Sequence, residues 1–372
     1  MKKIYYYIYM SLIQQEPLLK ERSDRPSVIP IDPEFQSIWD MYKKAEASFW
    51  TVEELKLTED SKDWKNLERK FGKEQADLIK RLIENIFGFF SGADGLVNEN
   101  LAENFARIIP IPEVKCFYGF QIAIENIHNE AYGILIQRLI QSRERQLELL
   151  NAIHEMPNIA KLYRWARHWI HITPEDELQN NPRLNPESER DRELAHIWCF
   201  AKRLVAFACV EGIMFSGPFC AIFWLKELGI FPGLTFTNEL ISKDEGMHTS
   251  FACHLYKNFI VNKPPAEDIL EIIKEAVEFK QEFMDSFLGR LQGLNKSNMC
   301  QYIEFVADTL LNMLGYKKHY ITPLPSELKF MEKISIDGMT NFFEKRVGEY
   351  SLGGFEGDDD DNNKADLLVD DF

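Results

Sequence analysis

Hydrophobic and polar residues alternate with a helical period over most of this chain. Apolar residues recur at three- and four-residue spacing in long stretches, whereas the alternation typical of strands is scarce. The stretches are residues 74–90, 96–108, 117–142, 200–216, 236–260, 265–292 and 297–315. Capping or proline signals precede several of them, as in "TFTNEL", "KPPAED" and "LNKSNM". The pattern predicts an all-α fold built as a bundle of long helices.

Two segments lack this period. Residues 172–192, "ITPEDELQNNPRLNPESERDR", are rich in proline, asparagine and charge, and we interpret them as an exposed insertion. Residues 350–372 hold too little apolar surface to fold alone, which predicts a flexible acidic tail. We therefore expect one domain over residues 30–349, preceded by a flexible extension over residues 1–29.

The first residues, "MKKIYYYIYMSLIQQ", pair two lysines with an apolar run. No small-residue cleavage site follows, and the run is too short to span a bilayer. We interpret it as a disordered extension, or as the result of a start codon placed too early, with Met10 as the true start. No other segment approaches membrane length by this reading, so we expect no membrane association.

Net charge and cysteine content limit the possible partners and compartment of the protein. The 372 residues carry a formal net charge of −16, which argues against nucleic acid or an anionic membrane as a partner. Residues 351–372 contribute −7 of this, from eight acids and one lysine. The six cysteines form no C-x-x-C pair and mostly lie in apolar runs, which is typical of reduced thiols in a cytoplasmic protein.

Two pairs of residues on apolar helices share the spacing Glu-x-x-His. They are Glu125 and His128 in "AIENIHNEAYG", and Glu245 and His248 in "NELISKDEGMH". Residues three apart lie on one helix face, so each pair can offer a metal ion a carboxylate oxygen and an imidazole nitrogen. A third pair, Glu193 and His196, emerges from the charged insertion, and we interpret it as a solvated helix start.

Each Glu-x-x-His helix has a partner that carries an acid. Asp94, in "FFSGADGLVNENL", precedes Glu125 by 31 residues. Glu211, in "VAFACVEGIMFSG", precedes Glu245 by 34 residues. About thirty residues make one helix, a turn and a return to the same level of a bundle. Four helices would then bring four carboxylates and two histidines to one interior point, where unpaired carboxylates would be costly.

This ligand set suits a pair of iron or manganese ions in a four-helix bundle. Zinc favours fewer carboxylates and four ligands. Taken singly, each acid is compatible with a helix surface and each histidine with an ordinary core, but two matched pairs on apolar helices favour metal binding. The ligands alone leave three classes open: iron stores, di-iron oxygenases and desaturases, and radical generators.

Tyr132 bears on that choice. It follows His128 by four residues, hence one turn along the same face and about 5–6 Å away between Cβ atoms. An oxidised metal centre can take an electron from a phenol at that range, although a core tyrosine with an ordinary hydrogen bond has the same spacing. Phe215, Phe219 and Ile241 fall at the same level of the bundle, where their bulk would keep water from a phenoxyl radical.

Several motifs resemble the small, radical-bearing subunit of class I ribonucleotide reductase in its eukaryote-like form. They are "MYKKAEASFWTVEEL", "DGLVNENL", "CFYGFQIAIENIHNEAY", "VEGIMFSG", "FWLKELGIFPGLTFTNELISKDEGMH", "YIEFVADTLL" and "NFFEKRVGEY". The resemblance covers residues 17 to 350 and the last few residues. It implies a ferritin-like fold, a homodimer, two iron ions per chain that react with O2, and Tyr132 as a stable radical. The ligands that it implies are the six positions already reached from spacing.

The resemblance also implies a route for the radical to leave the subunit. Trp50, Asp244 beside Glu245, and His128 match its inner part, and Tyr350 matches its exit. An aspartate can accept hydrogen bonds from a ligand imidazole and an indole together. From sequence alone, Trp50 also suits an ordinary core position and Tyr350 an ordinary surface position.

The tail ends in "DLLVDDF", where apolar side chains interrupt the acids. Such an end suits an anchor that docks in a groove of a partner. Leu368, Asp371 and Phe372 match the pattern with which the family docks on the large catalytic subunit, whereas Asp366 stands where an aromatic residue is common. A purely solubilising tail is the alternative.

The chain departs from the family pattern at Lys243, Met214 and Pro218, and the insertion over 172–192 is longer than expected. None of these residues is a predicted ligand or the predicted radical tyrosine.

Two other functions are alternatives: an iron store or ferroxidase, which needs neither Trp50 nor a patterned tail, and a catalytically silent partner, which would have lost ligands. The sequence contains no glycine-rich phosphate loop, so no motif in it predicts nucleotide binding.

Overall fold

A computed structural model of the chain describes residues 12–20, 25, 27–288 and 291–335, and all regular structure within them is helical. The all-α prediction is confirmed. The α-helices are α1 (Leu12–Gln15), α2 (Gln36–Glu46), α3 (Thr58–Phe71), α4 (Lys73–Asn100), α5 (Pro112–Leu139), α6 (Arg143–Leu150), α7 (Ala152–Glu155), α8 (Pro157–His171), α9 (Pro174–Asn180), α10 (Glu189–Cys209), α11 (Phe215–Glu227), α12 (Pro232–Phe259), α13 (Ala266–Leu288), α14 (Lys296–Leu314) and α15 (Phe330–Ser335). Single turns of 3₁₀-helix lie at η1 (Pro33–Phe35), η2 (Val52–Glu54) and η5 (Ser326–Leu328).

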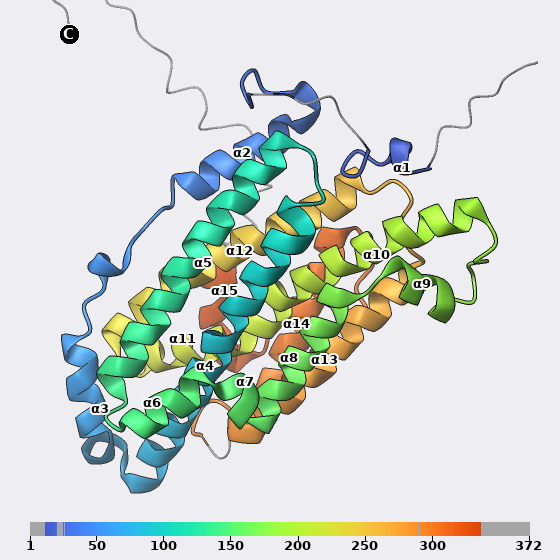
Figure 1. Cartoon of the computed structure of the whole chain (residues 1–372). Helices are drawn as coiled ribbons and strands as arrows, with labels where there is room; N and C mark the ends of the chain where they lie inside the picture. Colours follow the sequence, from blue (N-terminus) through green and yellow to red (C-terminus); the bar gives the residue numbers. More distant parts are fainter. Residues whose placement is uncertain (1–11, 21–24, 26, 289–290, 336–372) are drawn as a thin grey trace, which may run out of the picture.

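The long helices run side by side along one axis of the molecule (Figure 1). α4 packs on α5, α10 packs on α12, and α13 and α14 close the bundle beside them. Most of the long stretches with a helical period fall in one of these helices, because a stripe of apolar residues must be buried against a neighbour. The stretches 96–108 and 200–216 instead run from α4 into η3 and from α10 through η4 into α11. α2 lies along α5, and α6 to α8 cover α4.

Two π-helical segments interrupt the long helices. η3 (Leu101–Ala106) continues α4, and η4 (Val210–Met214) joins α10 to α11. π-helical turns often mark functional sites, and η4 carries Glu211. Gly212 lets η4 approach α12 closely, because a Cβ at Gly212 would lie 3.2 Å from the Thr249 methyl group. Pro218 lies inside α11, in the first turn after η4, and is buried.

The start of α12 is set by α3 rather than by a local cap. "TFTNEL" lies inside α12, so the helix start predicted there is wrong. The Asp60 carboxylate accepts hydrogen bonds from the backbone of Gly233 and Leu234 at 2.9 and 2.7 Å. Phe231 takes a left-handed backbone with φ of 55°, and its N–H donates to Asp63. These bonds satisfy the free N–H groups of the helix end and fix α12, which carries the predicted ligands Glu245 and His248.

Residues 172–192, predicted to be an irregular insertion, contain α9 and the first turn of α10. Thr173 caps α9, and the buried Glu177 accepts from Lys202 Nζ at 2.8 and 3.0 Å. Asp268 of α13 lies 2.8 Å from the same ammonium group. The prediction of a loop is therefore wrong over α9. Charged pairs hold this helix to the bundle, and such pairs give the sequence no helical period of apolar residues.

The prediction that residues 1–29 are flexible is wrong for residues 12–20. The carboxylate of Glu16 is buried and accepts hydrogen bonds from the backbone N–H groups of Val261 and Asn262, both at 2.8 Å. This ion-to-backbone pairing docks the segment on the end of α12. Met10 and the residues before it lie outside the described part of the chain, as does the predicted tail over 350–372.

One stretch of the described helices, residues 189–227, is long and apolar enough to cross a membrane. The prediction that no segment beyond the first residues approaches membrane length is therefore wrong. Of the most apolar window of this stretch, 89% is buried inside the bundle, as a core helix of a soluble protein would be. All six cysteines are free thiols, and four of them are buried.

Candidate metal centre

Four helical segments bring the predicted ligands into the middle of the bundle. They are α4 with Asp94, α5 with Glu125 and His128, η4 with Glu211, and α12 with Glu245 and His248. All six side chains are almost completely buried. Helices far apart in the sequence thus place four acids and two histidines in one interior cluster, as the spacing predicted.

The ligand atoms of Glu125, Glu211, Glu245 and His248 lie within 4.8 Å of one another. His248 Nδ1 lies 3.1 Å from Glu125 Oε1 and 3.0 Å from Glu245 Oε2. His128 Nδ1 lies 3.2 Å from Glu125 Oε2 and 3.1 Å from Glu245 Oε1. Glu125 and Glu245 therefore each face both imidazoles, and this arrangement allows two metal positions to share them.

Asp94 completes the set from the side of α4. Burial raises its pKa well above the usual range, and the charges of Glu125 and Glu245 raise it further. Its Oδ2 makes no hydrogen bond, and neither does Oε2 of Glu211. Buried carboxylate oxygens without donors are costly, and bound cations would supply the missing partners. The residues present therefore fit a pair of metal ions.

The two glutamates from η4 and α12 differ in protonation. Burial and the charge of Glu245 raise the pKa of Glu211 well above its usual range. Burial acts on Glu245 too, but the charge of His248 and the facing imidazole of His128 outweigh it and lower its pKa. Without metal, Glu211 therefore keeps a proton to a higher pH than Glu245 does. The neighbouring carboxylates overcome the effect of burial and raise the pKa of His248 to about 9.

Asp244 links the cluster to Trp50, as predicted. Its Oδ2 accepts from the Trp50 indole at 2.8 Å and lies 3.1 Å from Nε2 of His128. The indole also stacks on the imidazole, with ring centroids 5.9 Å apart and planes at 21°. Because one carboxylate oxygen contacts both rings, Asp244 fixes their orientation and directs Nδ1 of His128 toward the other ligands.

Tyr132 lies in an aromatic pocket beside the cluster. Its ring is fully buried and stacks on Phe90, with centroids 4.4 Å apart and planes at 8°. Phe90 in turn contacts the rings of Phe215 and Phe219, at 5.5 and 5.3 Å between centroids. The Tyr132 hydroxyl donates to Asn238 Oδ1 at 3.1 Å. Burial and the nearby carboxylates raise the pKa of Tyr132, so the phenol keeps its proton.

Three residues of this site, Phe90, Gln121 and Asn238, were not predicted from the sequence. Phe90 precedes Asp94 by four residues and Gln121 precedes Glu125 by four, so helical spacing places each on a ligand face. Asn238 precedes Glu245 by two turns. Gln121 Nε2 donates to Glu211 Oε1 at 3.1 Å and thereby ties η4 to α5. A search along the ligand faces of these helices would have found all three.

Of the other predicted residues, Ile241 is buried on α12. Glu193 binds the backbone N–H of Leu12 at 2.7 Å, and His196 is exposed, so this pair stands apart from the cluster. Tyr350 lies outside the described residues, and so do the predicted docking residues of the tail, Leu368, Asp371 and Phe372.

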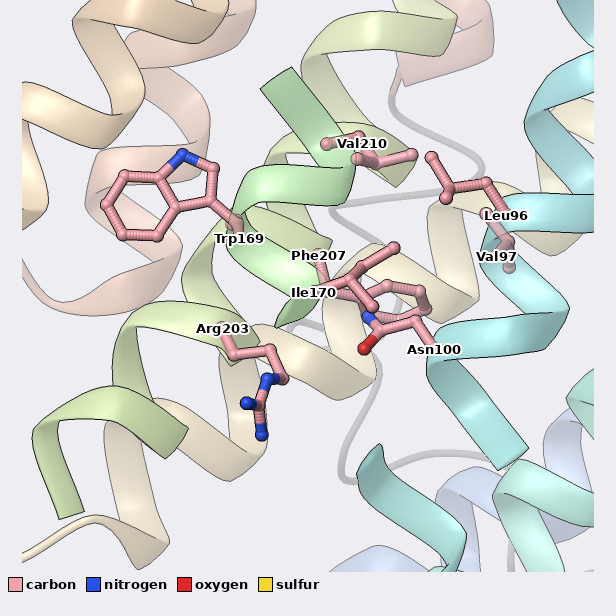
Figure 2. Close-up of a pocket in the computed structure, with 10 residues that line it drawn as sticks. Leu96, Val97, Asn100, Trp169, Ile170, Arg203, Phe207 and Val210 are labelled. Atoms are coloured by element: carbon pink, nitrogen blue, oxygen red, sulfur yellow. The ribbon is translucent and has the colours of Figure 1, made fainter. Parts of the chain in front are cut away.

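A small hollow lies between α4, α8 and α10 (Figure 2). Its lining is apolar apart from Asn100, Trp169 and Arg203, and it contains no carboxylate. Arg203 donates to the Ile172 carbonyl at 2.7 Å, which ties α10 to the start of the insertion. Val210, next to Glu211, closes one end of the hollow. The hollow is therefore separate from the ligand cluster.

Comparison with protein families gives a match over residues 30–326 to the model described as "Ribonucleotide reductase, small chain". The chain belongs to the ribonucleotide reductase small chain family. The matched range contains all six ligand positions, Trp50, Tyr132 and Asp244.

Curated relatives within this family share nearly half of their residues with the chain. The ribonucleoside-diphosphate reductase small chain of Trypanosoma brucei brucei is 48% identical over 91% of this chain and 90% of its own length. Subunit M2 of the human ribonucleoside-diphosphate reductase is 46% identical over 92% of this chain and 79% of its own length. Among solved structures, the Rnr4 homodimer of Saccharomyces cerevisiae is 34% identical, with a TM-score of 0.69 over 87% of this chain and 92% of that one.

The departures of this ribonucleotide reductase small chain from the family pattern leave the ligand cluster intact. Lys243 is exposed on α12, although Asp244 next to it is buried. Met214 is buried at the end of η4. The indole of Trp50 donates its hydrogen bond to Asp244 although Lys243 stands next to that aspartate.

Proposed function

We propose that this chain is the radical-generating small subunit of a ribonucleoside-diphosphate reductase, and that its radical resides on Tyr132. One observation carries the proposal. A buried cluster of four carboxylates and two histidines lies next to a buried phenol, and a hydrogen-bonded indole reaches the same cluster through Asp244. An iron store would have no use for that phenol or that indole. A silent partner would have lost ligands, and all six are present.

The six ligands would hold two iron ions, with Glu125 and Glu245 placed to contact both. When bound, these ions supply the electrons that reduce O2 and the oxidising power that removes one electron from Tyr132. Manganese suits the same oxygen-rich ligand set, so the proposed metal pair can be of either metal. Asp244 orients His128, and Gln121 orients Glu211, so the ligands are held in place before metal binds.

The pocket around Tyr132 protects the oxidised phenol. Phe90 stacks on its ring, and Phe215 and Phe219 pack on Phe90 in turn. Ile241 is buried on α12, three residues after Asn238. Tyr132 has no exposed surface, so water and soluble reductants do not reach the ring. Asn238 accepts the hydrogen bond of the phenol when the proton is present. A persistent radical is expected in such a pocket, because its decay needs an electron donor that can come close.

The oxidising equivalent would leave along the chain His128, Asp244 and Trp50, which contact one another in this order. Tyr350 would pass it across the subunit boundary, and the tail would dock on the large catalytic subunit through Leu368, Asp371 and Phe372. This large subunit, rather than the present chain, would bind and reduce the ribonucleotide. We propose a homodimer as the assembled form, by analogy with the yeast relative, and a cytoplasmic location.

Reconstitution with a large subunit tests the function as a whole. The iron-loaded, O2-treated chain should support reduction of a ribonucleoside diphosphate only when a family large subunit is present. The Tyr132→Phe variant, loaded in the same way, should not. Turnover that is equal in the two proteins would reject the proposed function.

A further inference from the structure

A second hollow adjoins the one between α4, α8 and α10. It lies between α4, α7, α8 and η4, and its volume is about 30 Å³, compared with about 10 Å³ for the first. Leu96, Ala166 and Val210 line both hollows, so these three side chains form the boundary between them. Figure 2 shows Leu96 and Val210 together at one end of the first hollow. We call the two spaces the paired hollows.

The second hollow offers almost nothing to a polar molecule. Among its described lining residues, Tyr163 alone carries a hydroxyl group, and none carries a charge. A water molecule in a protein needs about two to four polar partners, whereas a small apolar molecule loses no hydrogen bond on entering such a space. Apolar cavities of this kind stay dry and take up guests such as xenon. The chemistry of the lining therefore selects a small, uncharged and apolar ligand.

The inner wall of the paired hollows consists of side chains that lie one helical turn from predicted ligands. Val97 lines the first hollow and follows Asp94 by three residues on α4. Phe207 lines it too and precedes Glu211 by four residues, across the junction of α10 with η4. Residues three or four apart share a helix face, so both side chains stand on a ligand face. The hollows thus end one layer of apolar side chains from the ligand cluster.

The paired hollows also expose the two segments that carry these ligands. Val210 is partly exposed, although Glu211, its neighbour in the chain, is almost completely buried. Gly92 and Ala93 of α4 line the second hollow and are partly exposed as well, whereas Asp94 is buried. A molecule in the hollows therefore contacts both α4 and η4 directly beside a ligand.

We propose that the paired hollows are the entry site through which O2 reaches the metal centre. The proposal rests on the proposed function, since O2 is the oxidant in that function. O2 is small, uncharged and apolar, as the lining requires. Binding in the hollows would hold it beside Val97 and Val210, and motion of these two side chains would then admit it to the cluster.

Xenon binding tests the site in the absence of metal. The metal-free chain, labelled at its valine and leucine methyl groups, is titrated with xenon under pressure and followed by nuclear magnetic resonance. We expect saturable shifts of the methyl signals of Leu96, Val97 and Val210. Ala166→Phe fills the space next to both hollows and should abolish these shifts. Ala160→Phe is the matched control, because Ala160 is also on α8 but lines neither hollow, and it should keep them.

Stopped-flow absorption measures the reaction of the Fe(II)-loaded chain with O2. In Ala166→Phe, the second-order rate constant should fall several-fold. Iron content and the final yield of the radical should stay unchanged, because α8 carries no predicted ligand. Ala160→Phe should react as the parent does. Ala166→Leu adds less bulk, so it should give a smaller decrease, and it serves as the test if the core does not accept the larger ring.

Two results would overturn the proposal. One is the lack of a saturable xenon response in the parent, which needs no variant. The other is an unchanged rate constant for O2 in a folded Ala166 variant that has lost xenon binding, with folding checked by thermal unfolding. If the iron-loaded parent does not react with O2 at all, the proposed function fails. If it reacts and forms the radical, but filling the hollows changes nothing, the further inference alone fails.

Discussion

The indole of Trp50 donates a hydrogen bond of 2.8 Å to the carboxylate of Asp244, although 194 residues separate them in the chain. The same carboxylate oxygen lies 3.1 Å from His128, so a buried aromatic residue between α2 and η2 is connected to the predicted ligands by two contacts. A buried indole N–H needs an acceptor, and here the acceptor is the residue that also contacts His128. The connection therefore supports transfer of an oxidising equivalent through Trp50.

Replacing Trp50 with phenylalanine should abolish ribonucleotide reduction while iron content stays unchanged. The substitution keeps an aromatic ring in the core and should lower the free energy of unfolding by only about 1–3 kcal/mol. Trp165→Phe is the matched control, since the Trp165 indole is also buried and donates to a carboxylate, that of Glu275, at 2.9 Å. Both variants are assayed with the large subunit. Normal turnover in Trp50→Phe would exclude this route.

Replacing Glu245 or His248 with alanine should empty at least one metal position. Each side chain contacts the opposite pair of ligands, so its loss weakens both the charge balance and the geometry of the site. Metal analysis after loading and desalting measures the effect. His196→Ala, a change to the exposed histidine of the third Glu-x-x-His pair, should leave metal content unchanged. A larger loss in His196→Ala than in His248→Ala would show that the wrong pair has been chosen.

Metal loading should release protons, and metal affinity should rise with pH through the neutral range. Burial and neighbouring carboxylates raise the pKa values of Asp94 and Glu211 in the metal-free cluster, and the pKa of His248 is about 9, so His248 carries a proton near pH 7. Metal ions bind the deprotonated forms, and lowering the pH therefore favours the metal-free state. Titration with Fe(II) in weak buffer with a pH indicator measures the release. Loading without proton release would contradict these assignments.

Deletion of residues 366–372 should leave iron binding, the dimer and the Tyr132 radical intact but abolish turnover with the large subunit. The deleted residues mix acids with Leu367, Leu368, Val369 and Phe372, a composition that suits a docking anchor. A peptide of these seven residues should compete with the intact chain and inhibit it. A scrambled peptide of equal composition is the control. Full activity of the shortened chain would place docking elsewhere.

Sequence alone predicted the helices and the six ligands because both follow from the period of the α-helix. Glu125 and His128 share a face by spacing, and apolar stretches show which helices are buried. α9 was missed because it is held by the ion pair of Glu177 with Lys202, which has no period in the sequence. The start of α12 was misplaced because its cap, Asp60, comes from another helix.

The residues around the radical site show the same limit. Phe90 and Asn238 contact Tyr132 from two different helices, and such contacts depend on the rotation of each helix about its axis. Spacing along one helix cannot supply that rotation. The left-handed backbone of Phe231 was equally hidden, because it depends on the bond from its N–H to Asp63.

The most direct test of the central claim is electron paramagnetic resonance of the chain loaded anaerobically with Fe(II) and then exposed to O2. The unmodified protein should show a tyrosyl radical that persists for minutes, with the visible absorption of an oxidised iron pair. Tyr132→Phe removes one hydroxyl from a pocket of unchanged shape, so it should bind as much iron and show no persistent radical. A persistent tyrosyl radical of full intensity in Tyr132→Phe would contradict the assignment of the radical to Tyr132.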